Sequence, residues 1–300
     1  MGSPRKSRAS AQKSVAIIGG GRVGSALASL LSRLGQETTL WSRRPLELAG
    51  VRCYHGEPAP AELRDAGVIV IAVRDEAITP VAQTLRALLA SGARRPEAIV
   101  HVSGAHPAAE VLAPLVDLVP VGTMHPLIAV RSAEQGMAMM PRAFWALEGS
   151  DIAVAICADM IEAFLAKGGP RPLRLKSEDL ALYHACAVIA SNHAVALWAT
   201  ARDTLRRLGR VDPKTATAML VPLLESTLAN VETHGLPEAL TGPIRRGDLA
   251  TLRRHLAALR ARAPSLVASY RADAELAHIA LGRGSDDGSN LAMMLESEEE

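Results

Sequence analysis

The sequence predicts an α/β protein in which a doubly wound parallel sheet is followed by an all-helical domain with one long helix. The first half alternates short β-branched runs with helical patterns, which is typical of a parallel sheet with crossover helices. The second half keeps a helical period throughout. We therefore expect an α/β domain over residues 14–176 and a helical domain over residues 177–282. Residues 1–13, which are basic, and residues 283–300, which are acidic, are expected to be a disordered leader and tail.

The elements of the first half follow from short apolar runs and their boundaries. Residues 68–73 give the clearest strand, because an unbroken run of Val, Ile and Ala indicates burial on both faces of a sheet. Asp75 and Glu76 begin the next helix, since acidic residues favour a helix N-terminus. Strands are expected at residues 15–18, 37–41, 51–54, 68–73, 98–102, 119–124, 144–147 and 171–175, with further helices at 22–34 and 151–166.

The second half begins with the longest predicted helix. Ser177 is expected to cap it, and no Gly or Pro interrupts it before Gly209. Asp212 and Pro213 then start a second helix in the N-cap and first-turn positions, running to His234. A loop is expected at residues 240–248, followed by a helix that Asp248 caps and that runs to about residue 263, and by a last helix from residue 264.

Three glycines in G-x-G-x-x-G spacing, Gly19, Gly21 and Gly24, lie between the first strand and the first helix. This context is typical of a Rossmann domain that binds a dinucleotide. We expect Gly19 to make the tight turn, Gly21 to let the backbone approach a pyrophosphate, and Gly24 to pack the helix against the strand. The backbone N–H groups around Arg22 and Val23 would then face the phosphates at the positive end of the helix dipole.

The end of the second strand favours NADP(H) over NAD(H) as the cofactor. An NAD site usually has an acidic residue about 20 positions beyond the glycines, which binds the ribose 2′-hydroxyl. This chain has Ser42, Arg43 and Arg44 there, with no carboxylate. A hydroxyl and two guanidinium groups suit a 2′-phosphate, which they can bind through charge-assisted hydrogen bonds.

The composition argues against several classes of protein. A formal net charge of +2 over 300 residues gives no reason to expect a nucleic-acid or membrane partner. No apolar run approaches the ~20 residues that a transmembrane helix needs. Cys53, Cys157 and Cys186 form no C-x-x-C pair, so neither a metal site nor a redox dithiol is expected. Such a cysteine pattern fits a reducing cytoplasm.

Several motifs together resemble a known bacterial family. They are residues 19–24 (GGGRVG), 73–78 (VRDEAI), 101–105 (HVSGA), 125–127 (HPL), 183–192 and 240–248 (LTGPIRRGD), with His255. On these motifs, which span residues 14 to about 275, the chain resembles the family that joins a Rossmann-like domain to DUF2520. Its layout is also similar to 6-phosphogluconate dehydrogenase, ketopantoate reductase, pyrroline-5-carboxylate reductase and prephenate dehydrogenase. The resemblance implies an NADP oxidoreductase that forms a homodimer through its helical domain.

Three polar residues follow predicted strand ends, namely Arg74, Ser103 and His125. We expect them to face one cleft, because ligands of open α/β sheets bind at the carboxyl ends of the strands. Val73 and Arg74 would pass beside the ribose and nicotinamide, while Ser103 could bond the nicotinamide or a substrate oxygen. His125, titrating near neutrality, could transfer the proton that accompanies a hydride, or could cap the loop before Pro126. The His-Pro pair resembles the loop of prephenate dehydrogenases whose histidine bonds the reacting hydroxyl.

His184 and Asn192 are the candidates on the long helix. They lie roughly 80° apart around its axis at 3.6 residues per turn, so Asn192 can face the cleft with His184 nearby. The resemblance implies a catalytic lysine one turn before the asparagine, but this chain has Val188 there. Either His184 replaces that lysine as proton donor or no equivalent exists, and Asn192 could instead bond a neighbouring helix.

Thr241 and Arg245, in the expected loop, are the candidates for substrate binding. An arginine there would suit a substrate carboxylate, which it can bind with two hydrogen bonds. If the helical domain dimerises, this loop could reach the cleft of the partner subunit. The alternative is a simple connection between helices.

We therefore expect an NADP-dependent oxidoreductase that transfers hydride to the carbonyl or imine carbon of a small carboxylate. Ketopantoate-like 2-oxo acids are favoured by resemblance. A prephenate-type dehydrogenase is the alternative among enzymes. A non-catalytic NADP-binding sensor or assembly protein is the alternative of another class, and the missing lysine supports it.

Overall fold

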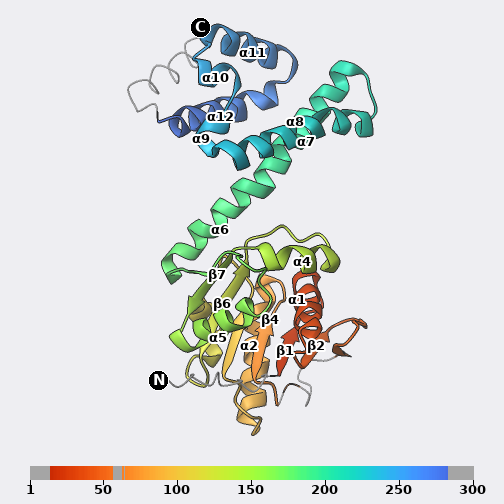
Figure 1. The fold of residues 1–300 in the computed structure, drawn as a ribbon, viewed down its shortest axis with the longest axis vertical. Coiled ribbons are helices and arrows are strands. Elements are labelled where there is room, and N and C mark those ends of the chain that lie inside the picture. The colour runs from red at the N-terminus through yellow and green to blue at the C-terminus, as the bar shows by residue number, and fades with distance from the viewer. Residues whose placement is uncertain (1–13, 57–62, 64, 283–300) are drawn as a thin grey trace, which may run out of the picture. The chain divides into compact units, whose positions relative to one another are not determined.

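The computed structural model describes residues 14–56, 63 and 65–282 (Figure 1). The expected leader and tail lie outside these residues. The chain divides into two compact units, the first ending at Ser191 and the second beginning at Asn192. Within the described residues, the first unit holds all of the strands, and the second is helical. The expected fold class, a doubly wound α/β domain followed by a helical region with a long helix, is confirmed.

The first unit is built on a sheet of eight described strands in the order β3-β2-β1-β4-β5-β6-β7-β8. Strands β1 to β6 pair in parallel, which puts the reversal of strand order between β1 and β4. The strands are β1 (Val15–Ile18), β2 (Thr38–Ser42), β3 (Arg52–His55), β4 (Val68–Ile71), β5 (Ala98–His101), β6 (Val121–Pro126), β7 (Trp145–Gly149) and β8 (Leu173–Arg174).

Strand β7 departs from the parallel arrangement that the sequence predicted. It runs antiparallel to β6, with Pro126 opposite Trp145, and β8 then runs parallel to β7. The chain re-enters the sheet at the end where β6 leaves it, so the intervening residues need not cross the sheet as a parallel connection must. The strand β6 also extends two residues further than expected, which places His125 inside the ladder opposite Ala146.

Helices cover both faces of this sheet. Val15 and Ile17 pack in one buried cluster with side chains of α1 and α5, while Ala16 and Ile18 pack in a second with side chains of α2. Neighbouring residues of β1 thus enter opposite cores, as expected for a strand buried on both faces. The helices of the first unit are α1 (Arg22–Arg33), α2 (Asp75–Ala90), α3 (Ala108–Val111), α4 (Ala133–Met139), α5 (Asp151–Glu162) and α6 (Leu180–Val188).

The long helix predicted from Ser177 is present but differs in two ways. Ser177 does not cap it; instead its hydroxyl donates a 2.6 Å hydrogen bond to Oε1 of Glu148. The helix is also interrupted by a π-helical turn at Ile189–His193, between α6 and α7 (Ala194–Gly209). The angle of 80° between His184 and Asn192 therefore does not hold, because it assumed 3.6 residues per turn throughout.

The second unit has a small core. Its cluster of buried residues, Leu252, Leu256 and Ala274, joins α11 to α12. The predicted start of α8 is confirmed, since the Asp212 carboxylate accepts hydrogen bonds from the backbone N–H groups of Lys214 (2.8 Å) and Thr215 (3.2 Å). The expected loop at 240–248 contains a short helix. The helices after α7 are α8 (Pro213–His234), α9 (Leu236–Ala239), α10 (Gly242–Arg246), α11 (Leu249–Arg262) and α12 (Val267–Ala280).

One stretch of the described chain, Ser177–Gly209, is long and apolar enough to cross a membrane by length and composition. It has 33 residues, and its most apolar window has a mean hydropathy of 1.4 with only 6% of that window buried. The sequence had indicated no such stretch. A single helix of this kind is weak support for a membrane span, but its exposed apolar surface requires an explanation.

Candidate functional site

The glycine turn between β1 and α1 is crowded at two positions and open at the third. Gly19 has a φ of +123°, and a Cβ there would lie 2.3 Å from the carbonyl oxygen of Ala72. A Cβ on Gly24 would lie 2.0 Å from the carbonyl oxygen of Gly19. A Cβ on Gly21 would meet nothing within 4 Å. Gly19 and Gly24 are therefore needed for the turn and for helix packing, whereas Gly21 leaves space in front of the backbone.

This space belongs to a cleft of about 1590 Å³ at the carboxyl edge of the sheet. All of the residues that line it lie in the first unit. It is large enough for a small ligand or cofactor. The sequence-predicted residues that line it are Gly19, Gly21, Arg22, Val23, Ser42, Arg43, Arg44, Val73, Arg74, Ser103, His125 and His184.

Ser42, Arg43 and Arg44 form one end of the cleft wall, directly after β2. The Ser42 side chain is buried, and its hydroxyl donates a hydrogen bond to the carbonyl oxygen of Arg44. This bond folds the backbone back at the strand end. Both arginines are exposed at the cleft, so their cationic groups lie where an anionic group could be bound, whereas the hydrogen of the Ser42 hydroxyl is used by the carbonyl oxygen of Arg44.

His125 lies against three groups of the first unit. Its Nδ1 is 3.0 Å from the hydroxyl oxygen of Tyr183, and the two rings meet edge to face. The ring of His184 is 5.8 Å away, centroid to centroid. On another side is Gly104, where a Cβ would lie 2.9 Å from atoms of the His125 ring. Only a glycine fits at that position without moving the imidazole.

The expectation that His125 titrates near neutrality is wrong. Burial, with the nearby His184 as a smaller cause, lowers the pKa of His125 to about 4, although Asp75 partly opposes this. Burial also raises the pKa of Tyr183 to about 12. At pH 7 the pair therefore consists of a neutral imidazole and a protonated phenol.

Ser103 and Arg74 follow β5 and β4, as predicted. The backbone N–H of Ser103 donates to Nδ1 of His101 (3.2 Å), and its hydroxyl oxygen accepts from the N–H of Ala105 (3.4 Å). The Arg74 guanidinium is exposed and forms an ion pair with Glu76 (3.1 Å). Ser103 thus has its backbone fixed beside the cleft, whereas Arg74 is held at the surface.

Asn192, Thr241 and Arg245 belong to the second unit. Asn192 lies in the π-helical turn, and Thr241 directly precedes α10. A guanidinium N–H of Arg245 donates to the carbonyl oxygen of Pro237 (3.0 Å). The expected capping role of Asp248 is confirmed, since its carboxylate accepts from the backbone N–H of Thr251.

Tyr183 and Gly104 are residues of the site that were not predicted from the sequence. Both lie in the quoted motifs, Tyr183 directly before His184 and Gly104 directly after Ser103. Their positions in these motifs were the available signal. Their contact with His125 joins β5, β6 and α6, which are far apart in sequence. In the described residues, no three His, Cys, Asp or Glu side chains gather closely enough to hold a metal ion.

Comparison with family models assigns both halves of the chain. The model of a Rossmann-like domain matches residues 2–126, and the model of DUF2520, a domain of unknown function, matches residues 143–276. The chain belongs to the family that joins these two domains. The glycine turn and the His125 cleft thus lie mainly in the Rossmann-like part, while Tyr183 and His184 come from the DUF2520 part.

Solved structures share the fold at low sequence identity. One from Bacteroides fragilis, named provisionally as an NADP oxidoreductase, is 20% identical, with a TM-score of 0.66 over 89% of this chain and 98% of that chain. Protein TM1727 of Thermotoga maritima is 21% identical, with a TM-score of 0.60 over 95% and 100%. The pyrroline carboxylate reductase of Plasmodium falciparum, solved with NADP bound, is 11% identical, with a TM-score of 0.57 over 94% and 98%.

A curated relative matches only part of this chain. It is the NAD(P)+ glycerol-3-phosphate dehydrogenase of Moorella thermoacetica, 32% identical over 99 residues. The match spans 27% of this chain and 29% of that relative. The relatives whose names state an activity are NAD(P)-dependent oxidoreductases, and the two whose names state a substrate act on different ones.

Proposed function

We propose that the chain is an NADP-dependent oxidoreductase that reduces the carbonyl or imine carbon of a small carboxylate, with ketopantoate-like 2-oxo acids as the favoured substrates. The observation that carries the proposal is the single cleft that joins the open glycine turn to His125 and, through it, to Tyr183. Gly21, between two crowded glycines, has open space in front of its backbone, and a pyrophosphate could approach the backbone there.

NADP(H) is the proposed form of the cofactor. Arg43 and Arg44 would hold the 2′-phosphate, with Ser42 donating to it once its hydroxyl turns away from the carbonyl oxygen of Arg44, and the backbone at Arg22 and Val23 would hold the pyrophosphate. When bound, the reduced nicotinamide supplies a hydride. The chain itself must then supply a proton to the oxygen or nitrogen of the substrate.

His125 and Tyr183 are the proposed source of that proton. With the Tyr183 hydroxyl donating to Nδ1, the neutral ring of His125 carries its hydrogen on Nε2. Nε2 can give this proton to the substrate oxygen while Nδ1 takes the proton of Tyr183, which solvent then restores. Such a relay needs no imidazolium, which agrees with the lowered pKa of His125.

The remaining predicted residues have secondary roles in this proposal. Ser103, which follows the carboxyl end of β5, would form a hydrogen bond with the carboxamide of the nicotinamide or with the substrate. Val73 and Arg74 would lie beside the ribose. His184 would shape the substrate end of the cleft. Asn192, Thr241 and Arg245 stay predictions for substrate contact.

The first experiment compares cofactors and then substrates. The protein is titrated with NADPH and NADH, and a panel of 2-oxo acids is added while the absorbance of the reduced nicotinamide is followed. Tyr183→Phe should lower turnover about 100-fold with little change in NADPH affinity, because only the relay is broken. Tyr270→Phe is the matched control, since Tyr270 bonds His255 in the second unit at 2.7 Å. Equal turnover in both variants would exclude the relay.

The alternatives give different results in the same assay. A prephenate-type dehydrogenase, which the His125-Pro126 pair favours, would oxidise prephenate with NADP+ and ignore 2-oxo acids. A sensor or assembly protein, which the Val188 position favours, would bind NADPH tightly without consuming it. Failure to bind either cofactor would overturn the whole proposal.

A homodimer through the second unit is part of the proposal. Large apolar side chains of α7 and α8 are exposed, and Met219 and Leu223 lie one helical turn apart on the same face. Apolar surface of this extent is typical of a protein interface. The exposed apolar side chains on these two helices are Val195, Leu197, Trp198, Leu208, Met219, Val221, Leu223 and Leu228.

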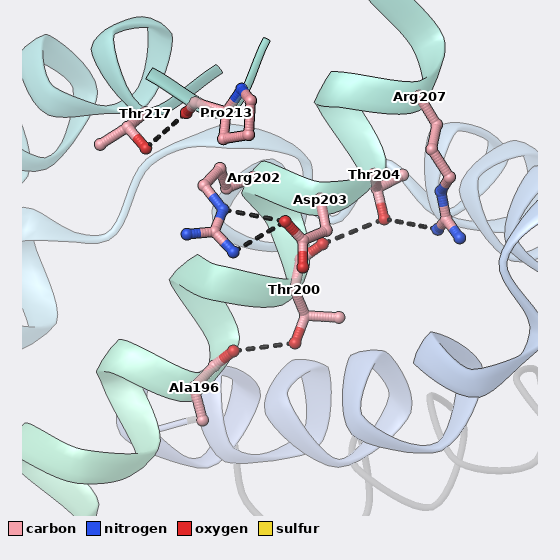
Figure 2. A network of polar contacts seen from close by, with 8 residues as sticks. All are labelled: Ala196, Thr200, Arg202, Asp203, Thr204, Arg207, Pro213 and Thr217. Atoms are coloured by element: carbon pink, nitrogen blue, oxygen red, sulfur yellow. Dashed lines mark hydrogen bonds and ion pairs between the residues drawn. The ribbon is translucent and has the colours of Figure 1, made fainter. Parts of the chain in front are cut away.

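Polar groups on α7 are compatible with burial against a second copy. The hydroxyl of Thr200 donates to the carbonyl oxygen of Ala196 (2.8 Å), and that of Thr204 donates to the carbonyl oxygen of Thr200 (3.0 Å), as Figure 2 shows. Arg202 is paired with Asp203 (2.8 Å). The two threonine hydroxyls are bonded within their own helix, so an interface could cover them at low cost, whereas the Arg202–Asp203 ion pair would fit the solvated rim of an interface.

We propose a cytoplasmic location without a membrane or nucleic-acid partner. The three cysteines are free thiols, as a reducing compartment allows. We attribute the exposed apolar surface of α7, the part of Ser177–Gly209 that lies in the second unit, to the subunit interface. Sedimentation with and without lipid vesicles separates the two explanations, since a dimer should stay in the supernatant.

A further inference from the structure

Glu148, on β7, is a buried carboxylate that the proposed chemistry does not use. The residue is only 3% exposed. Its Oε2 accepts hydrogen bonds from the backbone N–H of Ala108 (2.9 Å) and from the hydroxyl of Thr123 (3.2 Å). Its Oε1 accepts from the hydroxyl of Ser177 (2.6 Å). Burying a carboxylate is costly without such donors, so three of them converging on one side chain indicate a specific role.

The direction of the hydrogen bonds is fixed at the far end of this network. The backbone N–H of Ser103 can only donate, so Nδ1 of His101 accepts its bond. His101 therefore carries its hydrogen on Nε2 and donates it to the hydroxyl oxygen of Thr123 (2.9 Å). The hydrogen of Thr123 is then left for Glu148. Each bond of the chain points from Ser103 to Glu148.

The burial of His101 agrees with this assignment. The side chain is fully buried, and burial lowers its pKa to about 4, with Asp75 opposing and the other two nearby histidines, His106 and His125, adding to the shift. A neutral ring has one N–H and one acceptor nitrogen, which is what the network requires. Protonation would put two N–H groups face to face, at Ser103 and Nδ1.

The network joins two segments that lie on different sides of His125. One is the loop after β5, which contains Gly104. A Cβ at this glycine would lie 2.9 Å from atoms of the His125 ring, so its absence leaves room for the ring. The other begins at Ser177 and carries Tyr183, whose hydroxyl is 3.0 Å from Nδ1 of His125. Glu148 thus connects, through Thr123 and Ser177, to both neighbours of the imidazole.

We propose that Glu148 is a positioning residue, which holds the loop after β5 and the start of the α6 segment in the places that orient His125 in the cleft. The inference rests on the proposed function for the reacting role of His125, and it does not depend on which acid is the substrate. Loss of the network should let the ring leave its productive orientation, and rates are sensitive to such small displacements.

The test removes the central link without removing the buried carboxylate. Thr123→Val is nearly isosteric and leaves the Nε2–H of His101 without its acceptor, whereas Thr123→Ser restores the hydroxyl. Thr38→Val is the control for a Thr-to-Val change at a buried strand position, because it removes one hydrogen bond, to the carbonyl oxygen of Gln36 (2.9 Å), whereas Thr123→Val removes two. Two readouts that need no substrate are used: the ¹⁵N shifts of His101 and the rate at which diethylpyrocarbonate modifies His125.

In the wild type, the ¹⁵N shifts should place the proton of His101 on Nε2. Thr123→Val should raise the modification rate of His125 about tenfold or more, because it removes two hydrogen bonds and each opposes local opening by about threefold to tenfold. Thr123→Ser and Thr38→Val should stay near the wild-type rate. A proton on Nδ1 of His101, or equal rates in Thr123→Val and Thr38→Val, would overturn the inference.

Substitutions of Glu148 provide a second comparison. Glu148→Gln keeps an acceptor for Ala108 and Thr123 and can donate to the Ser177 oxygen, so His125 should stay as protected as in the wild type. Glu148→Leu removes every acceptor and should expose His125, and if it fails to fold, the Thr123 pair still decides. Equal protection of His125 in Glu148→Leu and Glu148→Gln would contradict the positioning role.

Turnover separates this inference from the proposed function. With an active substrate, Thr123→Val should lower kcat with little change in KM or in the affinity for NADPH. If none of the 2-oxo acids makes the wild type consume NADPH, the proposed function fails, but the two chemical readouts still test the network. If turnover is present but Thr123→Val leaves His125 and kcat unchanged, only the positioning role fails.

Discussion

The two units of this chain bury their apolar side chains to different degrees. In the first, clusters fill both faces of the sheet, and residues such as Ile17 and Leu27 have no exposed surface. In the second, Leu252 is fully buried, but Met219 is 51% and Leu223 61% exposed. The first unit has an extensive core on both faces of its sheet, whereas the second exposes apolar side chains on its helices, which fits the proposed subunit interface.

Each unit also contains a histidine in edge-to-face contact with a tyrosine. His125 and Tyr183 have ring centroids 5.6 Å apart at 88°, and His255 and Tyr270 have centroids 5.9 Å apart at 83°. The first pair lies at the cleft, where burial lowers the pKa of His125 to about 4. In the second, His255 is exposed on α11. The surroundings, and not the pair geometry, make the first pair a candidate for chemistry.

The largest expected effect tests how completely the first unit is packed. Gly24→Ala should destabilise that unit by more than ~3 kcal/mol, because its Cβ would lie 2.0 Å from the Gly19 carbonyl oxygen. Gly21→Ala has open space and should keep the melting temperature while weakening NADPH binding. Thermal melting and NADPH titration of both variants measure this, and a stable Gly24→Ala protein that binds NADPH normally would contradict the turn geometry.

Acid should selectively weaken the first unit. The pKa values of His101 and His125 are lowered to about 4 from 6.5, so between these pH values the unfolded chain binds protons that the folded chain does not. Stability is thus full above pH 6.5 and is lost as the pH falls toward 4. His101→Gln should reduce this slope by up to ~1.4 kcal/mol per pH unit.

Chemical denaturation at several pH values measures that slope. The difference in the free energy of unfolding at pH 8, where the histidines are neutral in both states, measures the packing that the variant loses. An unchanged slope in His101→Gln would mean that this histidine is not the buried neutral group described here.

Charged residues placed on the exposed apolar faces of the second unit should weaken the proposed homodimer. Met219→Glu together with Leu223→Glu should weaken a homodimer about 100-fold, or ~2.7 kcal/mol, because each subunit would place two charges in the interface. Ile152→Glu, on α5 of the first unit and 59% exposed before substitution, is the matched control. Analytical ultracentrifugation should show monomers only for the double variant. A monomeric wild type would refute the subunit interface.

The smallest expected effect is confined to one end of the cleft. Arg43→Ala with Arg44→Ala should weaken NADPH binding about tenfold to thirtyfold, or ~1.4–2 kcal/mol, and leave NADH binding unchanged. Dimerisation should not change, since both residues lie in the first unit. Equal losses for NADPH and NADH would mean that the arginines do not select the 2′-phosphate.

Local sequence patterns located most of the fold. The glycine spacing after residues 15–18, a buried strand at 68–73 (observed at Val68–Ile71) and the Asp212-Pro213 helix start were predicted because each depends on neighbouring residues. The antiparallel direction of β7 and the π-helical turn at Ile189–His193 were not predicted. They depend on how the chain is placed relative to elements that are distant in sequence.

By itself, the sequence determined the fold class and the strand ends at which the cleft would form, since these follow from short-range periodicity and motif spacing, and the resemblance of its motifs to a known family identified the family. Only the tertiary structure decided which groups meet there. Tyr183 and Gly104 contact His125 across three separate elements, and burial moves the pKa of His125 away from neutrality. Contacts and desolvation of this kind depend on distances between remote residues, which no local pattern encodes.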